Sequence, residues 1–186
     1  EAVEVGRRAQ KLAQEIGDRL TEGEVLNILG ITYKRAGNYE LALVAYAEGL
    51  ALFRALGNHL GEGRVLNNLA LAHSVLGHYD QALALVNQSL QLPTGAVSKR
   101  GGFSHQALGH IYKDHGEFDQ ALDHFRQALL IAIEIGNQYL HLDSLLQIGR
   151  LYARQQQPDL AVAHLLQALK ISKETESKRN IYLCHK

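Results

Sequence analysis

The segment LNNLALAHSVLGHYDQAL, residues 66–83, concentrates side chains that could do chemistry. Histidine can act as a general base or as a metal ligand near neutral pH, and the asparagine amide can both donate and accept hydrogen bonds. The segment contains Asn67, Asn68, His73 and His78. It could therefore belong to a chemical site, or it could be one copy of a repeated element whose polar residues serve another purpose.

The spacing of the histidines argues against a metal or catalytic site. His105, His110 and His115 are five residues apart, so successive side chains are turned by about 140° on a helix and do not share a face. His110 and Asp114 do share a face, but two ligands make a weak site. The chain has no HExxH or CxxC motif and no glycine-rich loop with phosphate-binding spacing. The sequence therefore predicts no catalytic residue, no metal site and no cofactor.

The composition restricts the kinds of partner. Lys and Arg together number 19, as do Asp and Glu, so the formal net charge is zero. Nucleic-acid-binding domains usually carry a clear basic excess, and the apolar runs here are shorter than the roughly 20 residues of a membrane span. The single cysteine, Cys184, fits a reducing compartment such as the cytoplasm. We therefore expect a protein or peptide partner, and neither direct nucleic-acid binding nor membrane attachment.

The chain repeats itself at nearly constant spacing. Four small residues, Gly30, Ala70, Gly109 and Gly149, stand at equivalent places and are separated by 40, 39 and 40 residues. Apolar residues recur at helical spacing in each unit, which predicts two helices per unit. Glycines that could terminate these helices follow the same frame, at Gly17, Gly37, Gly57, Gly77, Gly116 and Gly136.

These residues make the chain resemble a tetratricopeptide repeat (TPR) array of the variety with the longer period. The third unit carries the family pattern in Leu108, Gly109, Tyr112, Gly116, Phe118, Ala121, Phe125 and Ala128. The second unit departs from it at Ala70, His73 and Val86, and the fourth at Gln156, Pro158 and Leu165. The resemblance implies an all-α fold: a right-handed superhelical solenoid of antiparallel helix pairs, with the small residues and aromatic rings at the helix contacts.

The array is expected to occupy residues 1–186 as a single domain. Residues 1–18 would form the second helix of a partial repeat, residues 19–58, 59–99, 100–137 and 138–178 would be full repeats, and residues 179–186 would begin a further helix. Neither end shows the atypical capping repeat that closes a natural array. We therefore expect the array to be part of a larger protein or to stack on something else.

One segment breaks the repeat. Pro93 stands where the first unit has Phe53, inside a second helix. Proline in a helix interior costs about 3 kcal/mol or more, so this helix is predicted to end near Leu92. The segment 93–102 is then either an insertion in a surface loop or a hinge between the two halves of the array.

By resemblance, the first helix of each repeat lines the concave face of the solenoid, which in this family commonly holds a peptide. The offsets from the small residue of each unit select candidate partner-binding residues: Asn27, Ile31, Lys34, Arg35, Arg64, Asn67, Leu71, Phe103, Gln106, His110, Lys113, Arg150 and Arg154.

Two properties of this set are informative. Amides recur three residues before the small residue, at Asn27, Asn67 and Gln106, and such a ladder could bind the backbone of an extended peptide or could be solvated. Together with the acidic residues at the same offsets, Glu24, Asp114 and Asp143, the set contains six basic and three acidic residues. This balance favours an acidic peptide or a carboxylate terminus.

Two hypotheses follow for the function. The first is a non-catalytic protein–protein interaction module that binds a peptide or partner in the concave groove. The sequences EIGN and ALGN resemble those of regulatory arrays in bacterial signalling and transcription-regulatory proteins. The alternative is a structural array that dimerises an attached effector domain through its end helices.

Overall fold

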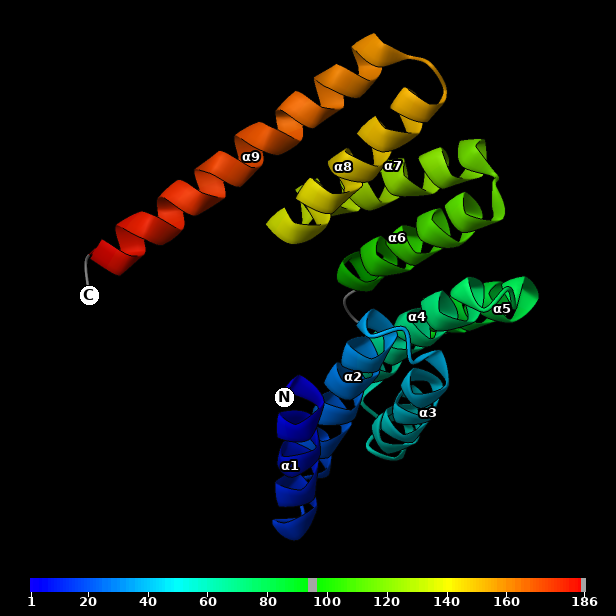
Figure 1. Cartoon of the computed structure of the whole chain (residues 1–186), viewed down its shortest axis with the longest axis vertical. Coiled ribbons are helices and arrows are strands. Elements are labelled where there is room, and N and C mark those ends of the chain that lie inside the picture. The colour runs from blue at the N-terminus through cyan, green and yellow to red at the C-terminus, as the bar shows by residue number, and fades with distance from the viewer. Residues whose placement is uncertain (94–96, 185–186) are drawn as a thin grey trace. The chain divides into compact units, whose positions relative to one another are not determined.

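The computed structural model describes the backbone of residues 1–93 and 97–184 and the side chains of residues 1–93 and 101–174. Every regular element in these ranges is an α-helix (Figure 1), as the sequence predicts. The chain divides into two compact units, Glu1–Arg100 and Gly101–Lys186, called here the N-terminal and C-terminal units. The division falls in the segment that interrupts the repeat.

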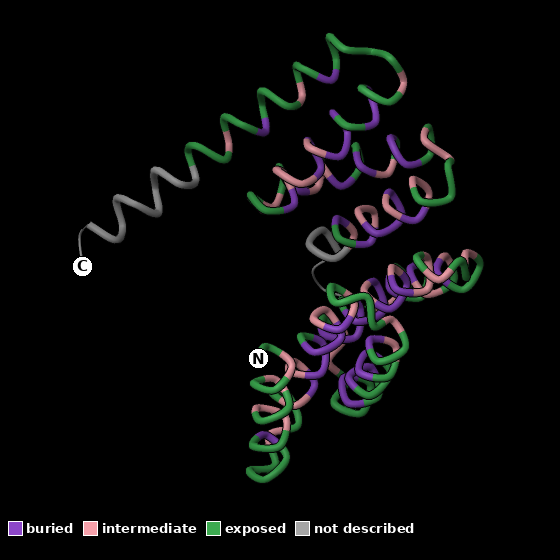
Figure 2. The backbone as a smooth tube through the Cα atoms, in the orientation of Figure 1, coloured by how far each residue is buried: buried purple, intermediate pink, exposed green. Residues whose placement is uncertain are grey.

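The N-terminal unit contains α1 (Ala2–Glu15), α2 (Arg19–Arg35), α3 (Tyr39–Ala55), α4 (His59–Val75) and α5 (Tyr79–Gln91). The C-terminal unit contains most of α6 (Val97–His115), followed by α7 (Phe118–Glu134), α8 (Gln138–Arg154) and α9 (Pro158–Cys184). Within each unit, consecutive helices pack on each other, and α2 also contacts α4. Buried residues, purple in Figure 2, recur along α2, α4 and α8. We call α2, α4, α6 and α8 the first helices, since each opens a helix pair.

Glycines in the left-handed conformation end six of these helices. The turn glycines predicted from the sequence all have positive φ angles, between 61° and 91°: Gly17, Gly37, Gly57, Gly77, Gly116 and Gly136. Glycine adopts this conformation without the steric cost that a Cβ atom brings, so the predicted glycine caps are confirmed. Where the last pair lacks a glycine, Gln156 takes the same conformation, with φ 58°.

The residue after several of these glycines starts the next helix. The side chains of Asp18, Asn58 and Asn137 each accept a hydrogen bond from the backbone N–H three residues later, at 2.9–3.0 Å. This is the standard N-cap interaction, which satisfies one of the unpaired donors at a helix start. A short Gly-Asn or Gly-Asp turn therefore ends one helix and fixes the start of the first helix that follows.

Two of the helix pairs, α2/α3 and α6/α7, are held by an aromatic ring against a glycine. The ring of Tyr46 on α3 is completely buried and lies so close to Gly30 on α2 that a Cβ atom there would overlap it. Phe125 on α7 has the same relation to Gly109 on α6, where an added Cβ would lie 2.7 Å from the ring. The predicted role of these residues in helix contacts is confirmed.

Pro93 shortens α5. This helix has 13 residues, whereas α3, the equivalent helix of the preceding pair, has 17. Leu92 is extended, with φ −62° and ψ 135°, which is the conformation that a following proline imposes. The predicted end near Leu92 is confirmed, and α6 begins at Val97, three residues before the expected repeat boundary. Residues 94–96 of the suggested hinge lie outside the described residues.

The last helix, α9, is longer than expected. It runs without a break from Pro158 to Cys184, across residue 178, where a new helix was expected to follow. The sequence has no glycine after Gly149, so the left-handed glycine that ends six of the other helices is missing here. Within the part of α9 whose side chains are described, Ala161 and Ala168 are the buried residues, and most others are exposed (Figure 2).

We predict that Gly30→Ala destabilises the protein. The added methyl group overlaps the Tyr46 ring, and overpacking of a close contact costs about 1–3 kcal/mol, more than the gain of about 1 kcal/mol in helix propensity. Gly101→Ala is the control, because its nearest neighbour, Ile131, would be at an ordinary 3.5 Å. Urea denaturation should show a lower free energy of unfolding for the first variant and an equal or higher one for the second. Equal effects would contradict the contact.

We also predict that Tyr46→Phe stabilises the protein. The Tyr46 hydroxyl is buried and has no hydrogen-bond partner among the described residues, and such a group costs about 1–3 kcal/mol. Tyr33→Phe is the matched control, since the Tyr33 hydroxyl accepts a hydrogen bond from Nε of Arg7 at 3.1 Å. Thermal unfolding in chloride buffer should give a higher Tm for Tyr46→Phe and a lower Tm for Tyr33→Phe. A loss of stability in both would be inconsistent with an unpaired hydroxyl.

Candidate functional site

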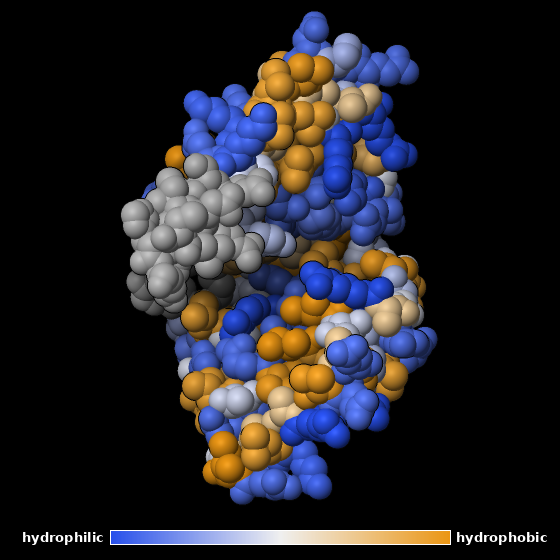
Figure 3. Space-filling model, turned by 60° about the vertical axis from the view of Figure 1, so that its left-hand side comes forward, coloured by the Kyte–Doolittle hydropathy of each residue, from blue (hydrophilic) through white to orange (hydrophobic). Residues whose placement is uncertain are grey.

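The thirteen candidate residues all lie on first helices, α2 and α4 in the N-terminal unit and α6 and α8 in the C-terminal unit. Each unit is considered by itself. The surface drawn in Figure 3 mixes apolar and polar side chains, so no single chemical character marks a site. The hydrogen bonds and ion pairs between first helices show which candidates are engaged within the protein and which remain open to a partner.

The two candidate asparagines are buried. Asn27 is 4% exposed and Asn67 is 6% exposed. The Oδ1 atom of Asn27 accepts a hydrogen bond of 2.9 Å from Nδ2 of Asn68 on α4. The amide of Asn27 therefore links α2 to α4. Asn68, which is not in the candidate set although Asn67 is, is the partly exposed member of that pair.

The register between α2 and α4 explains why Asn68 is the residue that binds Asn27. Asn27 and Asn68 are 41 residues apart, one more than the repeat spacing, so α4 presents the neighbouring residue to α2. Successive residues on a helix are turned by about 100° around its axis, so the side chains of Asn67 and Asn68 point in different directions. Asn68 and Gln147 both stand two residues before the small residue of their unit. The candidate set did not include this offset. A search at two residues before each small residue would have selected Asn68 and Gln147.

Arg64 is neutralised by a carboxylate. Its Nη2 atom lies 2.5 Å from Oε1 of Glu24. Both residues stand six positions before the small residue of their units, so this ion pair joins α4 to α2 beside the asparagine pair. Arg64 contributes little net charge to the surface.

In the C-terminal unit, Asp143 on α8 organises the polar side chains. Its carboxylate accepts hydrogen bonds from Gln106 at 2.6 Å and from Gln147 at 3.3 Å, and Nε2 of His110 lies 3.8 Å away. Burial alone would raise the pKa of Asp143, but the hydrogen bonds and the nearby imidazole outweigh it and hold the pKa below its usual value. Gln106, a member of the predicted ladder, therefore also links two first helices.

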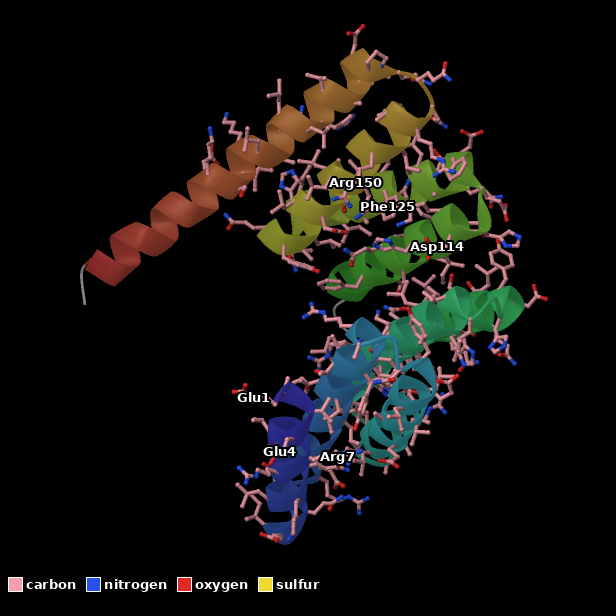
Figure 4. All side chains as sticks on the ribbon, viewed as in Figure 1. Glu1, Glu4, Arg7, Asp114, Phe125 and Arg150 are labelled. Atoms are coloured by element: carbon pink, nitrogen blue, oxygen red, sulfur yellow. The ribbon has the colours of Figure 1, made fainter. Side chains whose placement is uncertain are left out.

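Two of the basic candidates in this unit have intramolecular contacts. Nζ of Lys113 lies 3.2 Å from Nδ1 of His110 and 3.7 Å from a carboxylate oxygen of Asp114. The guanidinium of Arg154 lies over the ring of Phe118, 4.4 Å from its centre. Figure 4 labels Asp114 on α6 and Arg150 on α8.

Four basic candidates have no acidic side chain within 4.0 Å among the described residues: Lys34, Arg35, Arg150 and Arg154, the last of which lies over the Phe118 ring. Arg35 and Arg150 are exposed, and Lys34 is partly buried. Desolvation, together with the charge of Arg35, lowers the pKa of Lys34. The apolar candidates Ile31 and Leu71 are partly buried, and Phe103 is exposed.

Two histidine pairs lie near the first helices. Nδ1 of His105 on α6 is 3.0 Å from Nδ1 of His124 on α7, and the Tyr112 ring stacks on His124. The corresponding distance between His73 and His78 is 3.2 Å. Neither pair has a third ligand: in the part of the chain with described side chains, no three His, Cys, Asp or Glu residues are grouped to hold a metal ion.

The architecture defines a class of protein, the helical-repeat arrays built from antiparallel helix pairs. The family model of the tetratricopeptide repeat matches residues 26–94 and 103–174. The chain therefore belongs to the tetratricopeptide repeat family, as its sequence pattern suggests. No curated protein sequence matches the chain. None of the described helices combines the length and apolar character needed to cross a membrane.

Solved structures share this fold at low sequence identity. A Rap protein in complex with Competence and Sporulation Factor superposes with a TM-score of 0.82 at 16% identity, covering 95% of this chain and 50% of that one. The apo form of the quorum sensor NprR from B. thuringiensis gives 0.71 at 17% identity, covering 97% and 51%. BtubC from P. vanneervenii gives 0.63 at 18% identity, covering 94% and 88%. The chain thus spans about half the length of Rap and NprR.

We predict that the His105–His124 pair makes stability depend on pH. Burial lowers the pKa of both imidazoles, and for His124 the charge of His105 adds to this effect while Asp123 partly opposes it. The unfolded chain therefore binds more protons than the folded chain below about pH 6.5. The free energy of unfolding is therefore highest above that pH. It decreases as the pH falls toward the lower pKa values that the two imidazoles have in the folded chain.

Urea denaturation between about pH 7.5 and pH 5.5 measures this effect. The free energy of unfolding should decrease toward acidic pH, and His124→Gln should make the decrease smaller. An unchanged slope in the His124 variant would exclude this pair as a source of the pH dependence.

Proposed function

We propose that the chain is a non-catalytic protein-interaction module that binds an acidic peptide or an acidic segment of a partner on the faces of its first helices. We further propose that it forms the regulatory part of a larger bacterial signalling or transcription-regulatory protein and that it acts in the cytoplasm. Membership of the tetratricopeptide repeat family supports a role in protein–protein interaction.

The observation that carries this proposal is the uneven neutralisation of charge on the first helices. Arg64 pairs with Glu24, and Lys113 contacts both His110 and Asp114. Lys34, Arg35 and Arg150, and also Arg154 over the Phe118 ring, have no carboxylate within 4.0 Å among the described residues. Since the chain as a whole is neutral, a local excess of positive charge on these helices favours an acidic partner.

The similar structures support the regulatory context. One of them is a Rap protein bound to Competence and Sporulation Factor, and another is the quorum sensor NprR. Because this chain spans about half of each, an effector part elsewhere in the full-length protein is consistent with the proposal. The histidine pairs contain two ligands each, which favours a binding role over a catalytic metal centre.

A second function has its own support, namely dimerisation through the end helices. α1 exposes Val5 and Leu12, and Ile16, the residue that caps the end of α1, is exposed as well; the three lie within about 40° of one another around the helix axis. α9 exposes Val162, Leu166 and Leu169. Light scattering across a range of protein concentrations tests this alternative, and a mass that stays at the monomer value would exclude it.

The interaction proposal predicts which peptides the chain selects. A displayed random-peptide library panned against the immobilised chain should be enriched in Asp and Glu. The triple variant Lys34→Glu, Arg35→Glu, Arg150→Glu should lose the selected peptides by about tenfold or more in affinity, since each charge-assisted hydrogen bond contributes about 1.5–3 kcal/mol.

The control has the same change in net charge at positions away from the first helices. Lys11→Glu, Lys170→Glu, Lys173→Glu replaces three exposed lysines of α1 and α9 and should keep the affinity within about twofold. Selected peptides without acidic residues, or an equal loss in both triple variants, would refute binding on the first helices.

A further inference from the structure

The last turn of α2 carries two adjacent cations without a counterion. Lys34 is partly buried and Arg35 is exposed, and no acidic side chain among the described residues lies within 4.0 Å of either one. Their mutual repulsion and the desolvation of the ammonium group both disfavour charge on Lys34. An unpaired, partly desolvated ammonium group is unfavourable unless something compensates for it.

The other first helices do not share this arrangement. At the positions that correspond to Lys34 and Arg35, α4 has Ser74 and Val75. In α6 the corresponding Lys113 is engaged by His110 and Asp114, and in α8 Arg154 lies over the Phe118 ring. Basic residues in the last turn of a helix stabilise its carbonyl end. That role explains a single cation in the last turn of α2, but not two adjacent cations without contacts.

The buried hydroxyl of Tyr46 is a third group without a partner. The Tyr46 side chain is completely buried, and its hydroxyl makes no hydrogen bond to any described residue. Burial raises the pKa of this hydroxyl, and the charge of Arg35 acts in the opposite direction. The hydroxyl is therefore within electrostatic reach of Arg35 at the end of α2.

The packing of α3 on α2 brings these groups together. The Tyr46 ring, including the carbon that bears the hydroxyl, lies against Gly30. Lys34 follows Gly30 by four residues, so it stands one turn later on the same face of α2. Helical side chains lean toward the N-terminus of their helix, so the stem of Lys34 is expected to lean back toward Gly30, where the Tyr46 ring lies.

We propose that Lys34, Arg35 and the Tyr46 hydroxyl form a binding site for an oxyanion, a carboxylate or phosphate group. The site offers an ammonium group, a guanidinium fork and a hydroxyl donor, and hydrogen bonds from such donors to an anionic oxygen are among the strongest in proteins. A bound oxyanion neutralises the two cations and gives the hydroxyl the acceptor that it lacks.

This site deepens the proposed function and rests on it for its biological ligand, which would be a carboxylate of the partner. The glutamate substitutions at Lys34 and Arg35 test partner binding, whereas small anions test the site alone. If small anions fail to bind while acidic peptides bind, the oxyanion site is wrong and the interaction proposal stands. If small anions bind but no acidic peptide is selected, the oxyanion site stands and the interaction proposal is wrong.

The experiment is a titration of the ¹⁵N-labelled full chain with inorganic phosphate and, separately, with acetate, at constant ionic strength maintained with chloride. We expect saturable chemical-shift changes at the end of α2 and at Tyr46. Saturation by both anions identifies a general oxyanion site that a peptide carboxylate can occupy. Saturation by phosphate alone identifies a phosphate site and excludes the carboxylate source.

Three variants locate the site. Arg35→Gln and Lys34→Gln should each weaken the binding of phosphate by about tenfold, and Arg35 is exposed, so that its variant is expected to fold. Lys173→Gln, which removes an exposed cation of α9, should bind phosphate as the wild type does. Shift changes that do not saturate, or the same affinity in the Arg35 and Lys173 variants, would overturn the proposal.

Tyr46→Phe gives a readout that a purely structural role would not change. In chloride buffer this variant is expected to melt at a higher temperature than the wild type. Phosphate should raise the Tm of the wild type more than that of the variant, because only the wild-type hydroxyl gains an acceptor. An equal rise in Tm for both proteins would show that the hydroxyl does not contact the anion.

Discussion

The packing of an aromatic ring on a glycine is the constraint on which the rest of this structure depends. Tyr46 on Gly30 and Phe125 on Gly109 each bring two antiparallel helices so close that no Cβ atom fits between them. This contact fixes the position of one helix along the other. The turns within the helix pairs are two or three residues long and contain a left-handed residue, which is glycine in every pair except the last, and α2 also contacts α4 directly.

Polar residues on the first helices are used mainly to join neighbouring pairs. Asn27 binds Asn68, Arg64 binds Glu24, and Asp143 gathers Gln106 and Gln147. Apart from Arg64, which is exposed, these groups are partly or fully buried, so their hydrogen bonds avoid the cost of leaving polar atoms unpaired. The chemistry open to a partner is what remains after this pairing. It consists of a few cations and one buried hydroxyl, and these carry the functional proposals.

The departures from regular repetition have identifiable local causes. Pro93 removes a hydrogen-bond donor and forces Leu92 to be extended, which shortens α5 and places the division between the two units nearby. Gln156 adopts a left-handed conformation at a position where the earlier turns have glycine. The absence of any glycine beyond Gly149 leaves α9 without the usual stop.

The sequence by itself determined the helical class, the spacing of the repeat, the glycine turns and the early end of α5. These features depend on backbone preferences of single residues and on the side on which apolar residues recur, and both are local. Only the tertiary structure decided that Asn68 rather than Asn67 faces Asn27, that Arg64 is neutralised, and that Lys34 and Arg35 are not. Those outcomes depend on the register between helices. A shift of one residue along a helix turns the side chain that faces the neighbouring helix by about 100° around the helix axis. No pattern within a single helix determines that register.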